Sequence, residues 1–224
     1  MALLRSIATV GSMTMVSRVF GFARDILIAA NLGAGMAADV FFVAFKFPNL
    51  FRRLFAEGAF SMAFVPIFAG ILEEEGKAKA KEFADQAMGI LLSGLLVLVI
   101  ILEITMPWAM RVFAPGFLDD PRKFVMAVEL TRITFPYLLL ISLVSLLAGV
   151  LNSFGKFAAA AATPILLNLC MIGALLFWAP VSKAPGHTLA WAVFFAGLVQ
   201  FLWIAYHCMK KGIWFRQNIR KNIS

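Results

Sequence analysis

Residues 84–110 read ADQAMGILLSGLLVLVIILEITMPWAM, and only Asp85 and Glu103 in this stretch are charged. About 20 apolar residues are enough for a helix to cross the hydrocarbon core of a bilayer. The composition of the whole chain of 224 residues agrees, because 62% of its residues are hydrophobic and 14% are charged. A soluble domain has about 45–50% and about 25%, respectively. The sequence therefore predicts an all-α integral membrane protein.

Outward from this stretch, the sequence contains further apolar segments joined by short turns. The expected membrane spans are 6–30, 36–57 (continuing to 72), 84–110, 125–151, 158–179 and 187–209. We therefore expect a bundle of six transmembrane helices over residues 1–209, followed by a basic interfacial tail over residues 210–224.

The second span is longer than one crossing needs. Residues 36–72 would measure about 55 Å as one straight helix. Proline removes a backbone hydrogen bond and glycine relaxes a helix, so we expect a kink or break near Pro48 or Gly58.

Lys and Arg are distributed unequally between the two sets of loops. One set, which includes both termini, holds ten of them and the other holds four. Because cytoplasmic loops are enriched in Lys and Arg, we expect both termini and the loops around Lys77 and Lys156 to be cytoplasmic. The loops around Asn31, Asp119 and Lys183 are then expected on the outside.

The first two spans carry charges that a lipid-facing helix would not carry. They are Arg18, Arg24, Asp25, Asp39, Lys46, Arg52, Arg53 and Glu57. A charge near the bilayer centre costs about 2.5–3.5 kcal/mol, and such residues usually face a bundle interior or a water-filled cavity. Five of the eight charges are positive and three are negative, which leaves a surplus of +2 after every internal pairing. This surplus predicts a cavity that binds an anion.

Helical spacing groups the polar residues of each span on one face. The first helix groups Ser17, Arg18, Arg24 and Asp25, and the second has a stripe, at intervals of 7, 3, 4 and 4, of Asp39, Lys46, Asn49, Arg53 and Glu57. A guanidinium group offers a planar fork suited to phosphate or carboxylate. Arg18, Arg24 and Arg52 are therefore the first candidates for binding the anion.

A purely structural role for these charges is the alternative. It would pair Arg24 with Asp39, Lys46 with Asp25, and Arg53 with Glu57. Other intramembrane polar residues have two interpretations, since they either line the same cavity or form interhelical hydrogen bonds. These residues are Thr163, Asn168 and Gln200, and a packing salt bridge is expected among Glu103, Glu129 and Arg132.

Several kinds of site are not expected. The sequence has no Walker loop, HExxH or GxSxG motif, so we do not expect an enzyme. Cys170 and Cys208 lie in apolar contexts on different segments, and both histidines lie near segment ends, so we expect no disulfide, metal site or cofactor. The basic tail favours an anionic lipid surface over nucleic acid.

Three stretches closely resemble one family. They are SRVFGFARD (17–25), ADVF (38–41) and FPNLFRRLFAEGAFS (47–61), the last followed by Phe64, Val65 and Pro66. In these residues the chain resembles the MurJ (MviN) family of bacterial lipid II flippases, part of the multidrug/oligosaccharidyl-lipid/polysaccharide exporter superfamily.

The resemblance implies a transporter that carries the undecaprenyl-pyrophosphate-linked peptidoglycan precursor across the bacterial cytoplasmic membrane by alternating access. It assigns substrate binding to Arg18, Arg24, Arg52 and Asp39, and gate residues to Asp25, Asn49, Glu57 and Ser61. Ser17, Lys46 and Arg53 are expected beside them as further polar cavity residues.

The resemblance also implies partners. The chain matches one six-helix lobe of a two-lobed family, so a fragment is expected, with a second, C-terminal lobe as its partner beside lipid II and the membrane lipids. A coupling cation would bind in that second lobe. Two other functions are open from the residues alone: a structural or assembly subunit with intramembrane ion pairs, and an anion channel with an arginine column.

Overall fold

The computed structural model describes residues 2–54, 61–210 and 212, with side chains from Ile7 onward and without that of Ser61. Within these residues the chain is helical and contains no strand. The helices are α1 (Ala2–Leu32), α2 (Met36–Arg52), α3 (Ser61–Glu74), α4 (Lys77–Phe113), α5 (Pro121–Thr134), α6 (Tyr137–Ser153), α7 (Phe157–Ala161), α8 (Thr163–Phe177) and α9 (Pro185–Lys210), with short 3-10 turns η2 (Pro115–Phe117) and η3 (Ala179–Val181).

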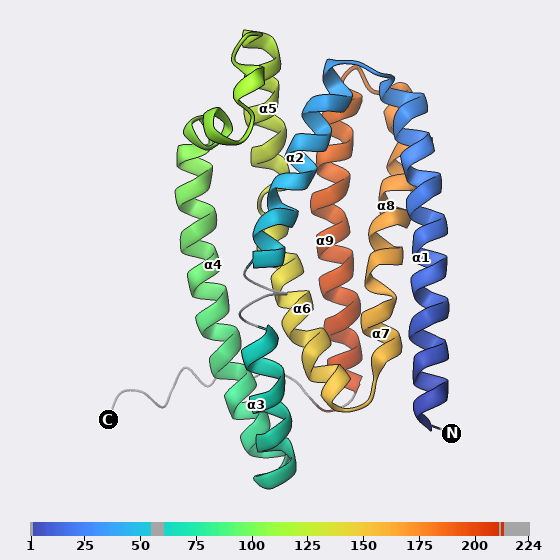
Figure 1. Ribbon diagram of the computed structural model, residues 1–224, viewed down its shortest axis with the longest axis vertical. Coiled ribbons are helices and arrows are strands. Elements are labelled where there is room, and N and C mark those ends of the chain that lie inside the picture. Colours follow the sequence, from blue (N-terminus) through green and yellow to red (C-terminus); the bar gives the residue numbers. More distant parts are fainter. Residues whose placement is uncertain (1, 55–60, 211, 213–224) are drawn as a thin grey trace.

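The helices form a bundle of roughly parallel rods (Figure 1). The predicted spans correspond to α1, α2 with α3, α4, α5 with α6, α7 with α8, and α9. Four of these six are long and apolar enough to cross a membrane, namely Lys77–Phe113, Pro121–Ser153, Phe157–Val181 and Pro185–Lys210. The crossings by α1 and by α2 with α3 stay predictions, because α1 is charged and α2 and α3 have only 17 and 14 residues.

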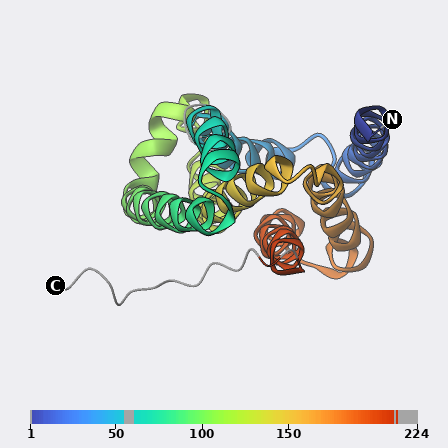
Figure 2. The same cartoon turned by 90° about the horizontal axis from the view of Figure 1, so that it is seen from below.

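The loops are sorted between two ends of the bundle (Figure 1). The upper end holds the loops at residues 33–35, 114–120 and 182–184, and the lower end holds the loops at 75–76 and 154–156. The start of α1 and the end of α9 also lie at the lower end. Seen from below, α1 and α8 lie at one side and α3 and α4 at the other (Figure 2).

The helix of the second span is not interrupted at Pro48. Pro48 is inside α2, which continues to Arg52, and residues 53–54 form a π-type turn. Gly58, the other predicted break point, lies outside the described residues, as does most of the predicted tail.

A neighbouring helix allows Pro48 to remain inside α2. Proline has no N–H, so the carbonyl four residues earlier loses its helical donor. That carbonyl is Ala44 O, and the Thr134 hydroxyl of α5 donates to it at 2.7 Å. Membrane helices tolerate proline where a nearby side chain satisfies the freed carbonyl in this way.

A second proline shows the same arrangement. Pro107 of α4 frees the Glu103 carbonyl, which accepts from Arg132 Nε of α5 at 3.1 Å. Arg132 therefore contacts the backbone of Glu103, whereas a side-chain salt bridge was predicted.

Aromatic packing fixes α2 against the rest of the bundle. The Phe47 ring lies 4.8 Å from that of Phe113 and 5.3 Å from that of Phe135, centroid to centroid. Phe51 packs edge-on against Phe135 at 5.6 Å. These contacts hold the polar residues in the last two turns of α2 in place.

Candidate functional site

The last two turns of α2 line a cavity of about 560 Å³ that we call the basic cavity. Its charged lining residues are Lys46, Arg52 and Arg53, and no acidic side chain is among its described lining. Its walls are otherwise mostly apolar, with Asn49 as the remaining polar residue, and consist of Val43, Phe45, Phe47, Leu50 and Phe113. Three cations beside mostly apolar walls make a site suited to an anion.

A second cavity of about 460 Å³, which we call the interior cavity, lies between α2, α3, α6, α8 and α9. It shares Asn49 and Arg52 with the basic cavity. The other residues of its lining with polar side-chain groups are Tyr137, Ser145, Asn152, Thr163 and Gln200. The two cavities thus meet at one half-buried arginine.

Asn49 positions that arginine. The Asn49 amide donates to the Phe45 carbonyl one turn earlier, at 2.8 Å, and its oxygen accepts from Arg52 Nε at 3.2 Å. Because a guanidinium has five N–H donors, the bond to Asn49 fixes one edge of the group. The shared position of Arg52 places it beside a ligand in either cavity.

Arg24 lies between three helices, with 17% of its side chain exposed. Its Nη1 donates to Asn168 Oδ1 of α8 at 2.9 Å, and its Nη2 lies 2.7 Å from Asp25 Oδ1. Asn168 in turn donates to the Ser17 carbonyl at 3.0 Å. The guanidinium carbon is also 5.7 Å from the centre of the Phe45 ring of α2.

Asp39 lies apart from these arginines. It is in the first turn of α2, at the upper end, and its carboxylate is 2.7 Å from Lys123 Nζ of α5. The pairing of Arg24 with Asp39, considered from sequence, is therefore wrong, and Arg24 pairs with Asp25 instead. Lys46 was predicted to pair with Asp25. In the structure Asp25 is the partner of Arg24, and Lys46 lines the basic cavity.

The remaining predicted residues are not gathered at the cavities. Arg18 is exposed on α1 and lines neither cavity. Ser17 contributes its carbonyl to the Asn168 contact. Glu57 and the Ser61 side chain lie outside the described residues, and with them the predicted Arg53–Glu57 pair.

The residues Thr163, Asn168 and Gln200 were expected either to line the cavity or to form interhelical hydrogen bonds, and both arrangements occur among them. Gln200 and Thr163 line the interior cavity, and Gln200 Nε2 also donates to the Thr163 carbonyl at 2.7 Å. Asn168 forms an interhelical bond to Arg24. Ser145 and Asn152 were not predicted to line a cavity, although their spacing of seven residues on α6 places them on one helical face.

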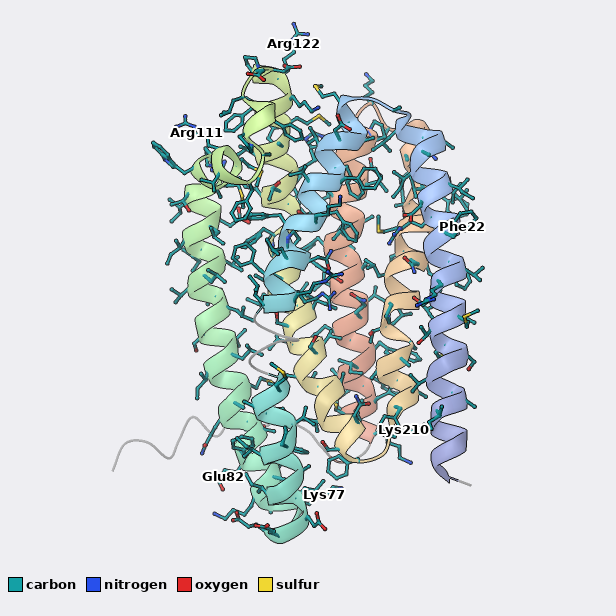
Figure 3. All side chains as sticks on the ribbon, in the orientation of Figure 1. Phe22, Lys77, Glu82, Arg111, Arg122 and Lys210 are labelled. Carbon is teal, nitrogen blue, oxygen red and sulfur yellow. The ribbon has the colours of Figure 1, made fainter. Side chains whose placement is uncertain are left out.

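Further charged residues lie at the two ends of the bundle. Figure 3 shows Arg111 and Arg122 at the upper end, Lys77, Glu82 and Lys210 at the lower end, and Phe22 pointing away from the bundle. At the upper end Glu129 lies 3.2 Å from His187 of α9. Among the described residues no group of three metal-ligating side chains occurs, and Cys170 and Cys208 are free thiols.

Comparisons with known proteins agree with this geometry. The profile of the family described as Lipid II flippase MurJ matches residues 28–223. The chain is similar to the probable lipid II flippase MurJ of Rhizobium tropici, with 50% identity over 204 residues that cover 89% of this chain and 38% of the relative. It is 45% identical over 202 residues to the lipid II flippase MurJ of Burkholderia cenocepacia, covering 90% and 39%.

A solved structure shares the fold. It is described as lipid II flippase MurJ in an inward closed conformation, with a TM-score of 0.71, 23% identity, and coverage of 90% of this chain and 42% of the other. The chain therefore spans about two fifths of the length of the proteins that it matches.

Proposed function

The chain belongs to the family of the lipid II flippase MurJ, and from this premise we propose that it forms part of a flippase for lipid II. The cargo is the undecaprenyl-pyrophosphate-linked disaccharide-pentapeptide, which moves from the inner to the outer leaflet of the bacterial cytoplasmic membrane. The names of the matched relatives support this cargo. No covalent chemistry is required.

The basic cavity carries the proposal. Lys46, Arg52 and Arg53 are the charged residues of its lining. A diphosphate is complementary in charge to three cations, and it accepts hydrogen bonds in the planar geometry that Arg52 offers. Next to apolar walls such contacts are stronger than in water.

The arginines of α1 have a related role in this proposal. Arg24 and Arg18 add positive potential on the helix beside the cavities, and Arg24 is held by Asn168 and Asp25. At the upper end the pair Asp39–Lys123 links α2 to α5. We assign this pair, with Asp25 and Asn49, to the contacts that change when access alternates between the two sides.

A second lobe completes the proposed transporter. Arg18 is exposed on α1, and an arginine near the bilayer centre is costly in lipid. We propose that a further helical lobe packs against this side, and that any coupling cation binds there rather than within residues 1–224. In the membrane the lower end faces the cytoplasm, because most Lys and Arg of the loops lie at that end.

A chimera tests the function. The matching 204-residue segment of the Rhizobium tropici relative is replaced by this chain, and the chimera is expressed in cells depleted of their own lipid II flippase. We expect growth and surface exposure of lipid II. Arg52→Ala and Arg24→Ala should abolish both at an unchanged protein level, whereas Arg52→Lys should retain part of the activity.

The matched control is Arg111→Ala, which removes an exposed arginine of α4 that lines neither cavity and should leave growth normal. Normal growth with Arg52→Ala and Arg24→Ala would contradict the binding role and favour purely structural charges. Failure of the parent chimera to support growth would contradict the proposed function itself.

A further inference from the structure

The interior cavity has a side that the proposed diphosphate contacts do not use. Opposite α2, it is lined by Gln200 of α9 and Asn152 of α6. Gln200 is 1% exposed, and its Oε1 has no hydrogen-bond partner among the described residues. The Oδ1 atom of Asn152 is likewise buried without such a partner.

The orientation of the Gln200 amide follows from its neighbour. The Thr163 carbonyl can only accept, so the group 2.7 Å from it is the Gln200 NH₂. The Gln200 oxygen then points away from that contact, and the cavity is lined by the same side chain. A buried acceptor without a donor is unfavourable, which indicates that a ligand or solvent molecule donates to it.

The lining of the interior cavity limits which chemical groups a ligand can place beside these two oxygens. The two amide oxygens accept hydrogen bonds from N–H or O–H donors, whereas the positive charge of Arg52 in the same cavity favours an anionic group nearby. Arg52 also disfavours a metal cation at these oxygens, because like charges repel. The ligand therefore carries hydroxyl or amide donors close to an anionic group.

The size and remaining walls of the cavity agree with such a ligand. Its volume of about 460 Å³ lies within the usual range of about 300–1,000 Å³ for small-molecule sites. A water molecule takes about 30 Å³ of liquid volume, so one bridging water would leave most of the space open. Tyr137, Ile141 and Leu167 offer apolar surface to the faces of a ring.

We propose that Gln200 and Asn152 bind the hydroxyl and amide groups of the carbohydrate–peptide headgroup of the cargo, next to a diphosphate at Arg52. This inference rests on the proposed function and adds selectivity to it. The amides distinguish a polyprenyl diphosphate that bears a sugar headgroup from one that bears none.

Binding measurements in detergent on the purified chimera, which carries the unchanged chain or one of its variants, test this selectivity. The two probes are lipid II and undecaprenyl diphosphate, which shares the lipid and the diphosphate but lacks the sugars and the peptide. The unchanged chain should bind lipid II more tightly. Gln200→Met and Asn152→Leu should each weaken lipid II binding about fivefold to tenfold and leave undecaprenyl diphosphate binding unchanged.

Two controls accompany these variants. Gln86→Leu removes an exposed amide of α4 that lines neither cavity and should change neither affinity. Arg52→Ala should weaken both probes. Thermal unfolding of each variant checks its fold, and the comparison of the two probes on the unchanged chain needs no variant.

The outcomes separate the two proposals. Equal affinity of the unchanged chain for both probes, or variants that weaken both probes alike, would overturn the selectivity inference and leave the proposed function in place. Failure of the unchanged chain to bind either probe would contradict the proposed function as well.

Discussion

Thr134 is a residue whose hydroxyl holds a second helix intact. It donates to the Ala44 carbonyl, the one that Pro48 deprives of its helical donor. Both Thr134 and Ala44 are fully buried, so solvent does not replace this bond. The cavity residues Asn49 and Arg52 follow Pro48 within about one turn, and the proline is tolerated next to them because of a side chain on α5.

Removal of the Thr134 hydroxyl should therefore lower the free energy of unfolding substantially only while Pro48 is present. We expect Thr134→Val to lower the free energy of unfolding by about 1–3 kcal/mol, because it leaves a buried carbonyl unpaired. In a Pro48→Ala background residue 48 has its own N–H, and the same change should cost less than about 1 kcal/mol. Unfolding of the purified chain in mixed micelles measures this cycle.

Thr131→Val is the matched control. The Thr131 hydroxyl contacts the Met110 sulfur at 3.6 Å. Thr131→Val should therefore lower the free energy of unfolding by the same amount with Pro48 and with Pro48→Ala. Equal costs of Thr134→Val with and without Pro48 would show that the hydroxyl does not substitute for the missing N–H.

At the scale of helices, hydrophobic length predicted most of the fold. Each of the six expected spans corresponds to one helix or to two helices in sequence, because a long apolar run has few alternatives to a helix in a membrane. A kink or break in the second span was expected from its length. The continuation of α2 through Pro48 to Arg52 was not, because the accommodation of Pro48 depends on α5, which lies far away in the sequence.

The candidate site was predictable only within single helices. Of the stripe predicted on the second span, Lys46, Asn49 and Arg53 line the basic cavity, whereas Asp39 pairs with Lys123 and Glu57 lies outside the described residues. Spacing did not identify the partner of Arg24, since Asn168 lies on α8, 144 residues further along the chain. Periodicity defines the face of a helix, whereas tertiary packing decides which helix that face meets.

At the scale of the whole molecule, the loops are divided between the two ends as the sequence predicts (Figure 1). Because this division places most basic loops at one end, the lower end is expected in the cytoplasm. The basic cavity lies along the last turns of α2, between the two ends of that bundle. A cargo that crosses the membrane would pass this region.

Cysteine labelling tests the orientation. In a background with Cys170 and Cys208 replaced by alanine, single cysteines are introduced as Asp119→Cys, Lys183→Cys, Lys77→Cys and Lys156→Cys. A membrane-impermeant maleimide added to intact cells should label the first two and not the last two. Labelling at position 156 from outside, with position 183 protected, would show the reverse orientation.

The central claim is that the basic cavity binds the headgroup of lipid II, and photo-crosslinking in cells measures this most directly. A photoreactive phenylalanine analogue replaces Leu50, which lines the cavity and is 43% exposed, or Ile104 of α4, which is 72% exposed and lines neither cavity. In the active chimera we predict a lipid II adduct at position 50, its loss with Arg52→Ala, and no adduct at position 104. Equal adducts at both positions, or none at position 50 in a chimera that supports growth, would contradict the claim.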